Sequence, residues 1–243
     1  MAFAQAYQIA STSLPLSPDE KRDMQWRLGM TNKLAPQLQG VLFAESVVHS
    51  AKFSPDGKRV VLMHRSNGTV RVWDPVTCQP VTVPLKHPGP MIEVVFSPDS
   101  QKLFTAISFQ GQSSLRCWDI ATGKEIAKTP INGRLSALVI NHTGTQVAAA
   151  SLVQGLLRGS GEVQLFDTRV LEKVGTPIEV AGGVSAALAF SPNDELLAVG
   201  TLNPKTSAVI YKTSDRSVLS EVASLQDHTT HDVAFDPDGA KLA

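Results

Sequence analysis

Phe53-Ser54-Pro55-Asp56-Gly57 is the stretch of sequence that decides the fold, because the chain repeats it. Clear copies begin at Phe96, Phe190 and Phe235, and a degenerate copy begins at Ile140. Successive copies lie about 43 to 50 residues apart. A period of this length that carries short strands is typical of a repeat architecture.

A second motif keeps the same period and follows each turn by about 20 residues. It ends in an aromatic residue and, in three of four copies, an aspartate: Trp73-Asp74, Trp118-Asp119, Phe166-Asp167 and Tyr211-Lys212. The residues before each aromatic residue are mostly β-branched or alternate in polarity, which favours strands. In the first unit we expect four antiparallel strands, at 47–53, 59–63, 69–73 and 80–85, separated by turns rich in Pro, Asn and Gly.

These motifs together resemble the WD-repeat β-propeller family, and the resemblance covers about residues 46 to 243. It implies an all-β fold with four full blades and a truncated fifth. The blades are expected at about 46–86, 87–130, 131–180 and 181–226, with a partial blade at 227–243. The stretch from Pro80 to Pro90 is similar to WD repeats of bacterial multidomain proteins, in which a propeller often follows a Ser/Thr kinase domain.

The resemblance also implies a hydrogen-bonded tetrad of His, Ser or Thr, Asp and Trp in each blade. His87, nine residues before Phe96, has the family spacing, and we expect it to bond Trp118 or a turn backbone. The equivalent histidine positions elsewhere are Ala44, Ile131 and Ala181, while His228 is displaced by two residues; the aspartate positions hold Asn67, Gln112, Ser160 and Lys205. No complete tetrad results, so we expect apolar packing between sheets to dominate, since a half-satisfied buried network is costly.

The two ends of the chain depart from the repeat. Residues 1–45 are interpreted as an N-terminal arm or linker, and Ser17-Pro18-Asp19-Glu20 predicts a short helix near 18–30. The fifth unit stops inside its second strand, whereas propellers of this family usually have seven blades. We therefore expect a fragment of a longer protein. The alternative is a small ring completed by a partner or a second copy, with self-association through open propeller edges.

Composition argues against several classes of partner. Lys and Arg number 22 and so do Asp and Glu, so a net charge of zero gives no electrostatic basis for binding nucleic acid or an acidic membrane. The sequence shows neither a signal peptide nor a membrane span. The two cysteines are expected to be free thiols. These features together predict a cytoplasmic protein.

Motifs that would indicate catalysis are missing from the sequence. It contains no phosphate loop, His-Glu-x-x-His pair, Cys-x-x-Cys pair, Gly-x-Ser-x-Gly elbow or kinase motif. His228, His231 and Asp232 crowd one short loop but are interpreted as solvated polar residues rather than metal ligands. Asp74, Asp119 and Asp167 are expected to cap the turn after the third strand. We therefore predict a protein that is not an enzyme and needs no cofactor or metal.

Two loops are the candidate partner-binding sites, because rigid scaffolds tend to carry binding residues on loops. The stretch 107–112 exposes Phe109 and Gln110, and the insertion at 152–161 carries Leu152, Val153, Leu156, Leu157 and Arg158. In the alternative interpretation Leu156 and Leu157 extend a strand and pack on its neighbour.

The leading functional hypothesis is a non-catalytic scaffold that binds proteins or peptides. One alternative is the regulatory or sensor portion of a multidomain signalling enzyme, such as a bacterial Ser/Thr kinase. Another is a lactonase-like or periplasmic ligand-binding propeller, since these also use Ser-Pro-Asp-Gly turns.

Overall fold

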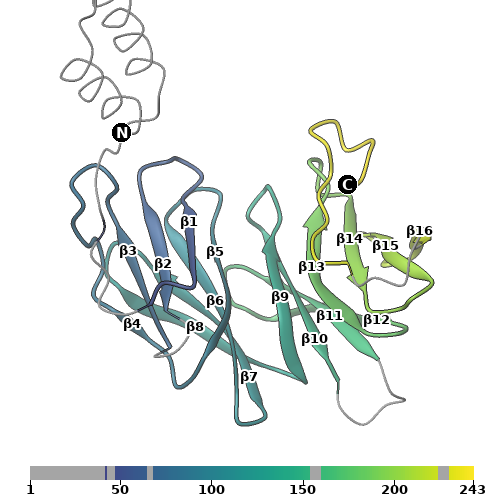
Figure 1. Ribbon diagram of the computed structural model, residues 1–243, viewed down its shortest axis with the longest axis horizontal. Helices are drawn as coiled ribbons and strands as arrows, with labels where there is room; N and C mark the ends of the chain where they lie inside the picture. Colours follow the sequence, from purple (N-terminus) through teal and green to yellow (C-terminus); the bar gives the residue numbers. More distant parts are fainter. Residues whose placement is uncertain (1–41, 43–46, 65–67, 154–159, 224–229) are drawn as a thin grey trace, which may run out of the picture. The chain divides into compact units, whose positions relative to one another are not determined.

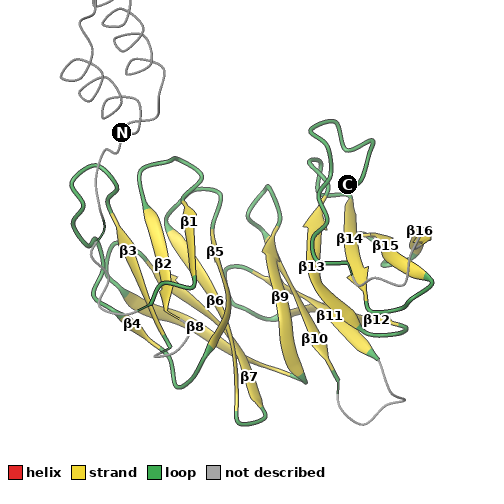
Figure 2. Cartoon of the chain, viewed as in Figure 1, coloured by secondary structure: helices red, strands yellow, loops and turns green. Residues whose placement is uncertain are grey.

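The computed structural model describes residue 42 and residues 47–64, 68–153, 160–223 and 230–243. These residues belong to one compact unit, Leu42–Ala243. Within them the chain forms sixteen strands in four sheets and no helix (Figures 1 and 2). The helix predicted near 18–30 lies outside the described residues.

Each sheet is one sequence repeat, folded as a four-stranded antiparallel meander in which every strand pairs with the next along the chain. Such a sheet is one propeller blade, so the all-β prediction with four full blades is confirmed. The first blade contains β1 (Ser50–Phe53), β2 (Val60–His64), β3 (Thr69–Trp73) and β4 (Leu85–Lys86); the second, β5 (Met91–Phe96), β6 (Lys102–Phe109), β7 (Gln112–Asp119) and β8 (Lys124–Ile131); the third, β9 (Arg134–Ile140), β10 (Gln146–Leu152), β11 (Gly161–Asp167) and β12 (Lys173–Val180); the fourth, β13 (Val184–Phe190), β14 (Leu196–Thr201), β15 (Thr206–Lys212) and β16 (Val218–Ala223).

The repeated Ser-Pro-Asp motif forms the turn between the first and second strands of a blade. The Ser54 hydroxyl donates to Asp56 Oδ1 (2.6 Å) and accepts from the Arg59 N–H (2.9 Å), while Gly57 adopts a positive φ of 69°. The same side-chain bond joins Ser97 to Asp99 at 2.5 Å. The motif therefore recurs because serine and aspartate satisfy the turn backbone while proline presets its φ.

Apolar side chains fill the space between successive sheets. One cluster joins the first and second blades through Val61, Val72 and Phe96, and others join the second to the third and the third to the fourth. The central strand β2 is buried along its whole length. Each fully buried Leu, Val or Phe stabilises the fold by roughly 1.5–3 kcal/mol relative to exposure, so inter-sheet packing is the main cohesive force.

Burial of the repeated phenylalanine depends on the preceding sheet. Phe96 and Phe190 are 6% and 5% exposed, whereas Phe53 in β1 is 67% exposed. The two buried residues belong to the clusters that join their blade to the one before it. Phe53 has no such sheet before it in the part of the chain that the structure describes, so the same residue type stays in solvent.

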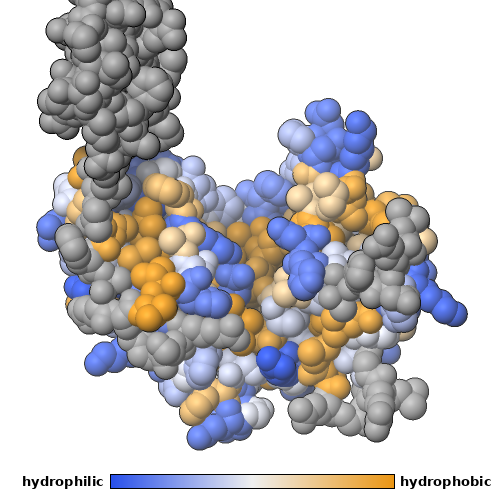
Figure 3. All heavy atoms as spheres, in the orientation of Figure 1, coloured by the Kyte–Doolittle hydropathy of each residue, from blue (hydrophilic) through white to orange (hydrophobic). Residues whose placement is uncertain are grey.

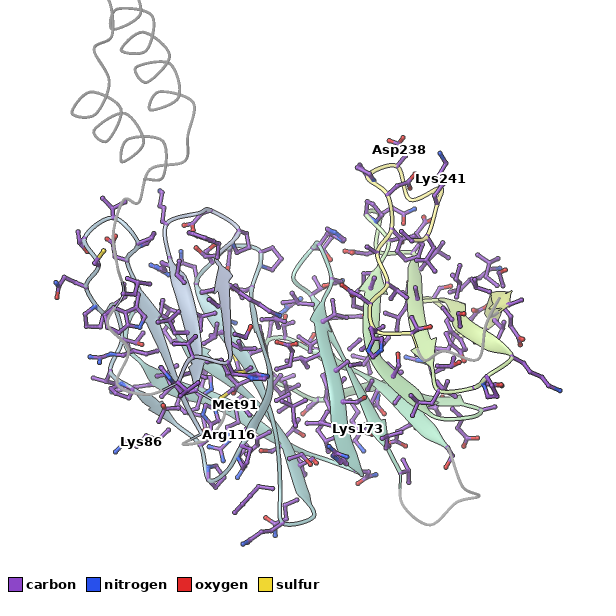
Figure 4. The ribbon with its side chains drawn as sticks, viewed as in Figure 1. Lys86, Met91, Arg116, Lys173, Asp238 and Lys241 are labelled. Atoms are coloured by element: carbon purple, nitrogen blue, oxygen red, sulfur yellow. The ribbon has the colours of Figure 1, made fainter. Side chains whose placement is uncertain are left out.

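The segment 230–243 continues the repeat beyond β16. Phe235 and Leu242 form an isolated antiparallel bridge, and Val233 joins a small cluster with Ala187 and Ala198 of the fourth blade. Asp238 and Lys241 lie at its tip (Figure 4). The tip is hydrophilic, and apolar surface lies beneath it (Figure 3). This segment packs a further hairpin-like turn on the fourth blade.

The outer strand of the first blade differs from the prediction of a strand at 80–85. Strand β4 is only Leu85–Lys86, and Pro80 forms an isolated bridge with Trp73. Proline cannot donate to a β-ladder. Thr82 replaces part of that ladder: its hydroxyl oxygen accepts from the Val72 N–H (3.1 Å), and its carbonyl accepts from Arg71 Nε (3.1 Å).

Candidate partner-binding site

A buried chain of hydrogen bonds crosses the second blade. Trp118 Nε1 donates to Thr105 Oγ1 (3.0 Å), and His87 Nε2 lies 2.9 Å from the same hydroxyl. His87 Nδ1 lies 3.1 Å from the Gly68 carbonyl, which can only accept, so Nδ1 carries the proton and Thr105 donates to Nε2. Every member of this chain is satisfied. The backbone carbonyl of Gly68 is the acceptor for His87, and no aspartate takes part in this chain.

Burial lowers the pKa of His87 to about 4, so the imidazole is neutral at physiological pH. The imidazole also contacts Trp118 edge-on, with 5.2 Å between ring centroids. Of the two hydrogen-bond partners expected for His87, the imidazole bonds the turn backbone directly. Its hydrogen-bonded connection to Trp118 runs through the Thr105 hydroxyl. The sequence spacing of His87 and Trp118 did not identify Thr105 as the third member of the network, although a threonine on the second strand is part of the family pattern.

Strand register explains why the network forms in this blade. Thr105 lies two residues beyond Leu103, the cross-strand partner of Trp118. The equivalent positions in the first, third and fourth blades hold Leu62, Ala149 and Val199. In the third blade Phe166 has no polar group that needs a hydrogen-bond partner at this position. In the first blade the buried Trp73 Nε1 has no hydrogen-bond partner and remains unsatisfied. These three blades therefore rely on packing at that position.

The aspartates after the aromatic residues cap turns. Asp74 Oδ1 accepts from the Val76 and Thr77 N–H groups, at 2.7 and 3.0 Å. Asp119 and Asp167 accept in the same way within their own turns. Hydrogen bonds from Thr122 lower the pKa of Asp119. Tyr211 is buried in the cluster between the third and fourth blades. None of these groups converges on a common site.

In the second and fourth blades, the last residue of the turn motif contacts the turn of the preceding blade. Asp194 Oδ1 accepts from the His142 N–H and Asp194 Oδ2 from the Thr143 N–H, both at 2.8 Å. Burial raises the pKa of Asp194, but these hydrogen bonds outweigh burial and lower it. In the second blade the Ser100 hydroxyl accepts from the Asp56 N–H (3.3 Å), and its carbonyl accepts from Arg59 Nη1 (2.6 Å). These contacts fasten neighbouring blades at one edge.

The predicted loop 107–112 is a tight hairpin. Strands β6 and β7 pair up to Phe109 and Gln112, so only Gln110 and Gly111 form the turn. Both have positive φ (50° and 77°), as a type I′ hairpin turn requires. Extended pairing therefore replaces the long loop that the sequence suggested. It makes the end of the second blade a rigid projection.

Phe109 is held in place by a close backbone approach. A Cβ built on Gly89 would lie 2.2 Å from Phe109 Cγ, so only glycine admits the ring there. The side chain of Phe109 is nevertheless 37% exposed. On the neighbouring side, the Ser113 hydroxyl donates to the Gly133 carbonyl (2.6 Å) and ties the hairpin to the turn before β9. An exposed aromatic residue on a fixed support is the kind of anchor that protein interfaces use.

A groove of about 690 Å³ runs beside this hairpin, and it is lined by β6, β7 and β8 together with Pro88. The register places one row of side chains on the same face: Ile107, Ser114 and Pro130 are cross-strand partners, and so are Thr105, Arg116 and Lys128. Its apolar wall includes Phe109 and its cationic floor consists of Arg116 and Lys128. A concave site of this size with a few polar groups suits a small ligand or a peptide side chain.

The cationic floor is incompletely neutralised. Arg116 Nη1 pairs with Glu125 Oε2 (2.6 Å), but Arg116 Nε is buried without a hydrogen-bond partner. Lys128 is exposed and lies directly opposite Arg116 across the strands. A like-charge pair in this position is unfavourable by itself. Strand β7, which carries Arg116, also buries Cys117, and burial raises the pKa of its thiol to about 11.

The second candidate loop is described only at its ends. Leu152 ends β10, pairs with Gly161 and packs against the cluster between the third and fourth blades. Val153 follows it and lies half-buried. Leu156, Leu157 and Arg158 lie outside the described residues, and so does His228. His231 and Asp232 are exposed.

Neither a metal cluster nor a membrane-spanning helix occurs among the described residues. They contain no group of three or more His, Cys, Asp or Glu side chains placed to hold a metal ion. They also contain no helix long and apolar enough to cross a membrane.

The fold and the repeated motifs define a repeat protein built of propeller blades. Residues 37–74, which contain β1, β2 and β3, match the family model described as WD domain, G-beta repeat. That segment is therefore similar to one repeat of the WD-repeat family. Domains of this family are generally non-catalytic and generally mediate protein–protein interactions. No curated protein matches the chain.

Proposed function

We propose that this chain is a non-catalytic scaffold that binds proteins or peptides through the hairpin end of the second blade and the groove beside it. The observation that carries the proposal is Phe109, which is partly exposed although its ring is fixed against Gly89. A preorganised aromatic residue loses little side-chain entropy on binding, so its contact area contributes efficiently to affinity.

The surroundings of Phe109 support the same proposal. The hairpin is pinned on one side through Ser113 and Gly133, and the blade below it contains the satisfied network of His87, Thr105 and Trp118. Such a support keeps the shape of the site between encounters with a partner.

The test is site-specific photo-cross-linking in the native host. A benzophenone amino acid replaces Gln110 at the hairpin, and a matched variant carries it at the exposed Thr176 of β12. We expect a discrete cross-linked protein from position 110 that is absent from position 176 and weakened by Phe109→Ser. Cross-links that are equal at both positions, or absent at position 110, would contradict the proposal. A cross-link to another domain of the same polypeptide would favour the regulatory-portion alternative.

A further inference from the structure

The groove beside the hairpin of the second blade has a chemistry that selects its occupant. Its floor carries two cations, Arg116 and Lys128, against one carboxylate, Glu125. The excess positive charge is local, because the chain as a whole has equal numbers of acidic and basic residues. An arrangement of this kind is complementary to an anion.

Arg116 presents part of its side chain to the groove. Arg116 is 12% exposed by its side chain, and its Nε has no acceptor. The Nε atom is itself buried, so an occupant of the groove would meet the part of the Arg116 side chain that lines it. Lys128, opposite Arg116, would gain from the same occupant, because a carboxylate between two cations removes their mutual repulsion.

The walls of the groove specify the rest of the occupant. Phe109, Ile107 and Pro130 form an apolar side next to the cationic floor. The groove of about 690 Å³ accommodates a few residues of a peptide rather than a folded surface. None of the residues that line the groove belongs to a strand of the first blade.

We propose that the groove binds a protein segment in which an aspartate or glutamate stands beside a large apolar residue. The carboxylate binds Arg116 and Lys128, and the apolar side chain packs on Phe109. This inference rests on the proposed function and names the chemistry of its partner. Figure 4 shows Arg116 on the second blade, from which the guanidinium reaches this floor.

The first arm of the test is a selection from a phage-displayed library of random dodecapeptides on the full chain. We expect selected peptides to be enriched in Asp or Glu adjacent to Leu, Ile, Phe or Met. Fluorescein-labelled copies of these peptides, with and without amide replacement of each carboxylate, then give dissociation constants by anisotropy.

The variants separate groove charge from surface charge. Lys128→Glu should weaken the acidic peptides about tenfold, whereas Lys124→Glu, an exposed lysine on the same strand outside the groove, should change affinity less than twofold. The amide peptides should bind weakly and should not distinguish the two variants. Phe109→Ser should weaken the acidic peptides without removing their sensitivity to Lys128→Glu.

Three results would overturn the proposal. The first is a set of selected peptides with no enrichment in Asp or Glu. The second is an equal loss of peptide affinity in Lys124→Glu and Lys128→Glu. The third is a dimer in light scattering that Lys128→Glu converts to a monomer, because the occupant would then be a second copy of the chain. If either of the first two results occurs together with a discrete cross-link at position 110, the scaffold function remains supported and only the acidic character of the partner is refuted. Loss of the cross-link as well would remove both.

Discussion

Replacing each of two tryptophans by phenylalanine tests whether the polar network stabilises the second blade. Trp73 and Trp118 occupy equivalent positions, and they are 6% and 7% exposed, so Trp→Phe removes a similar packing contribution from both. Only Trp118 donates a hydrogen bond, to Thr105, whereas Trp73 Nε1 is buried without a partner. The two variants therefore differ in what happens to the indole N–H: Trp118→Phe loses its hydrogen bond, whereas Trp73→Phe removes an unsatisfied donor.

The size of that difference follows from the two environments. Trp118→Phe loses a buried hydrogen bond with a net contribution of roughly 0.5–1.5 kcal/mol, whereas Trp73→Phe removes an unsatisfied donor that costs roughly 1–3 kcal/mol. We expect Trp118→Phe to be the more destabilising by about 2–3 kcal/mol. Arg71, whose guanidinium lies 5.2 Å from the Trp73 ring centroid, keeps an aromatic face in Trp73→Phe.

The assay is urea unfolding followed by far-UV circular dichroism, which does not depend on the replaced fluorophores. A double-mutant cycle with Thr105→Val isolates the bond, because only the hydrogen-bond part of the Trp118→Phe loss should disappear once the Thr105 hydroxyl is absent. Equal losses for the two tryptophans, or additivity of Trp118→Phe and Thr105→Val, would refute the account of the network.

Three further outcomes are expected. The wild-type protein should lose about 2 kcal/mol of its free energy of unfolding between pH 7.5 and pH 5. The reason is that His87 in the unfolded chain takes up a proton at its ordinary pKa of 6.5, whereas folded His87 has a pKa of about 4 and stays neutral. Chemical unfolding across this range should show a shallower pH dependence in His87→Gln. Gly89→Ala should displace Phe109 and weaken peptide binding at the groove several-fold. Anisotropy titration of the same peptide measures this loss, and unchanged affinity would contradict the role of Gly89 in holding the ring. Asp194→Gly should lower the unfolding midpoint although it relieves a positive φ of 61°, because the His142 and Thr143 N–H groups lose their acceptor. The contribution of Asp194 to stability should decrease as the pH falls through the lowered pKa of its carboxyl. An unchanged midpoint in the variant would show that this contact does not hold the blades together.

The blade architecture could be predicted from the sequence because its signals are local. The Ser-Pro-Asp turns and the Trp-Asp strand ends are short, and each satisfies its own backbone, as the bonds within Ser54-Pro55-Asp56 illustrate. The outer strand of the first blade could not be located, because proline interrupts its ladder and the Thr82 hydroxyl accepts from the Val72 N–H in place of a backbone carbonyl.

The site was harder to predict because it depends on register. Thr105 resembles any β-branched strand residue until the pairing of β6 with β7 sets it beside Trp118. Arg116 and Lys128 are twelve positions apart and become neighbours only through the pairing of β7 with β8. The contact of Phe109 with Gly89 requires the loop before β5 to reach the far end of β6. The exposed aromatic residue itself was visible in the sequence, but its support and its charged neighbours were not.

The polar network and the groove belong to the same rows of side chains, and this connects stability to binding. Thr105 and Arg116 are cross-strand partners, so the residue that joins His87 to Trp118 lies directly opposite a residue of the groove floor. Packing alone tolerates small shifts between sheets, whereas a satisfied buried network favours one arrangement. The blade that holds the network is also the blade that presents the groove. Thr105→Val should consequently weaken peptide binding even though its hydroxyl is committed to His87 and Trp118 and makes no contact with the ligand.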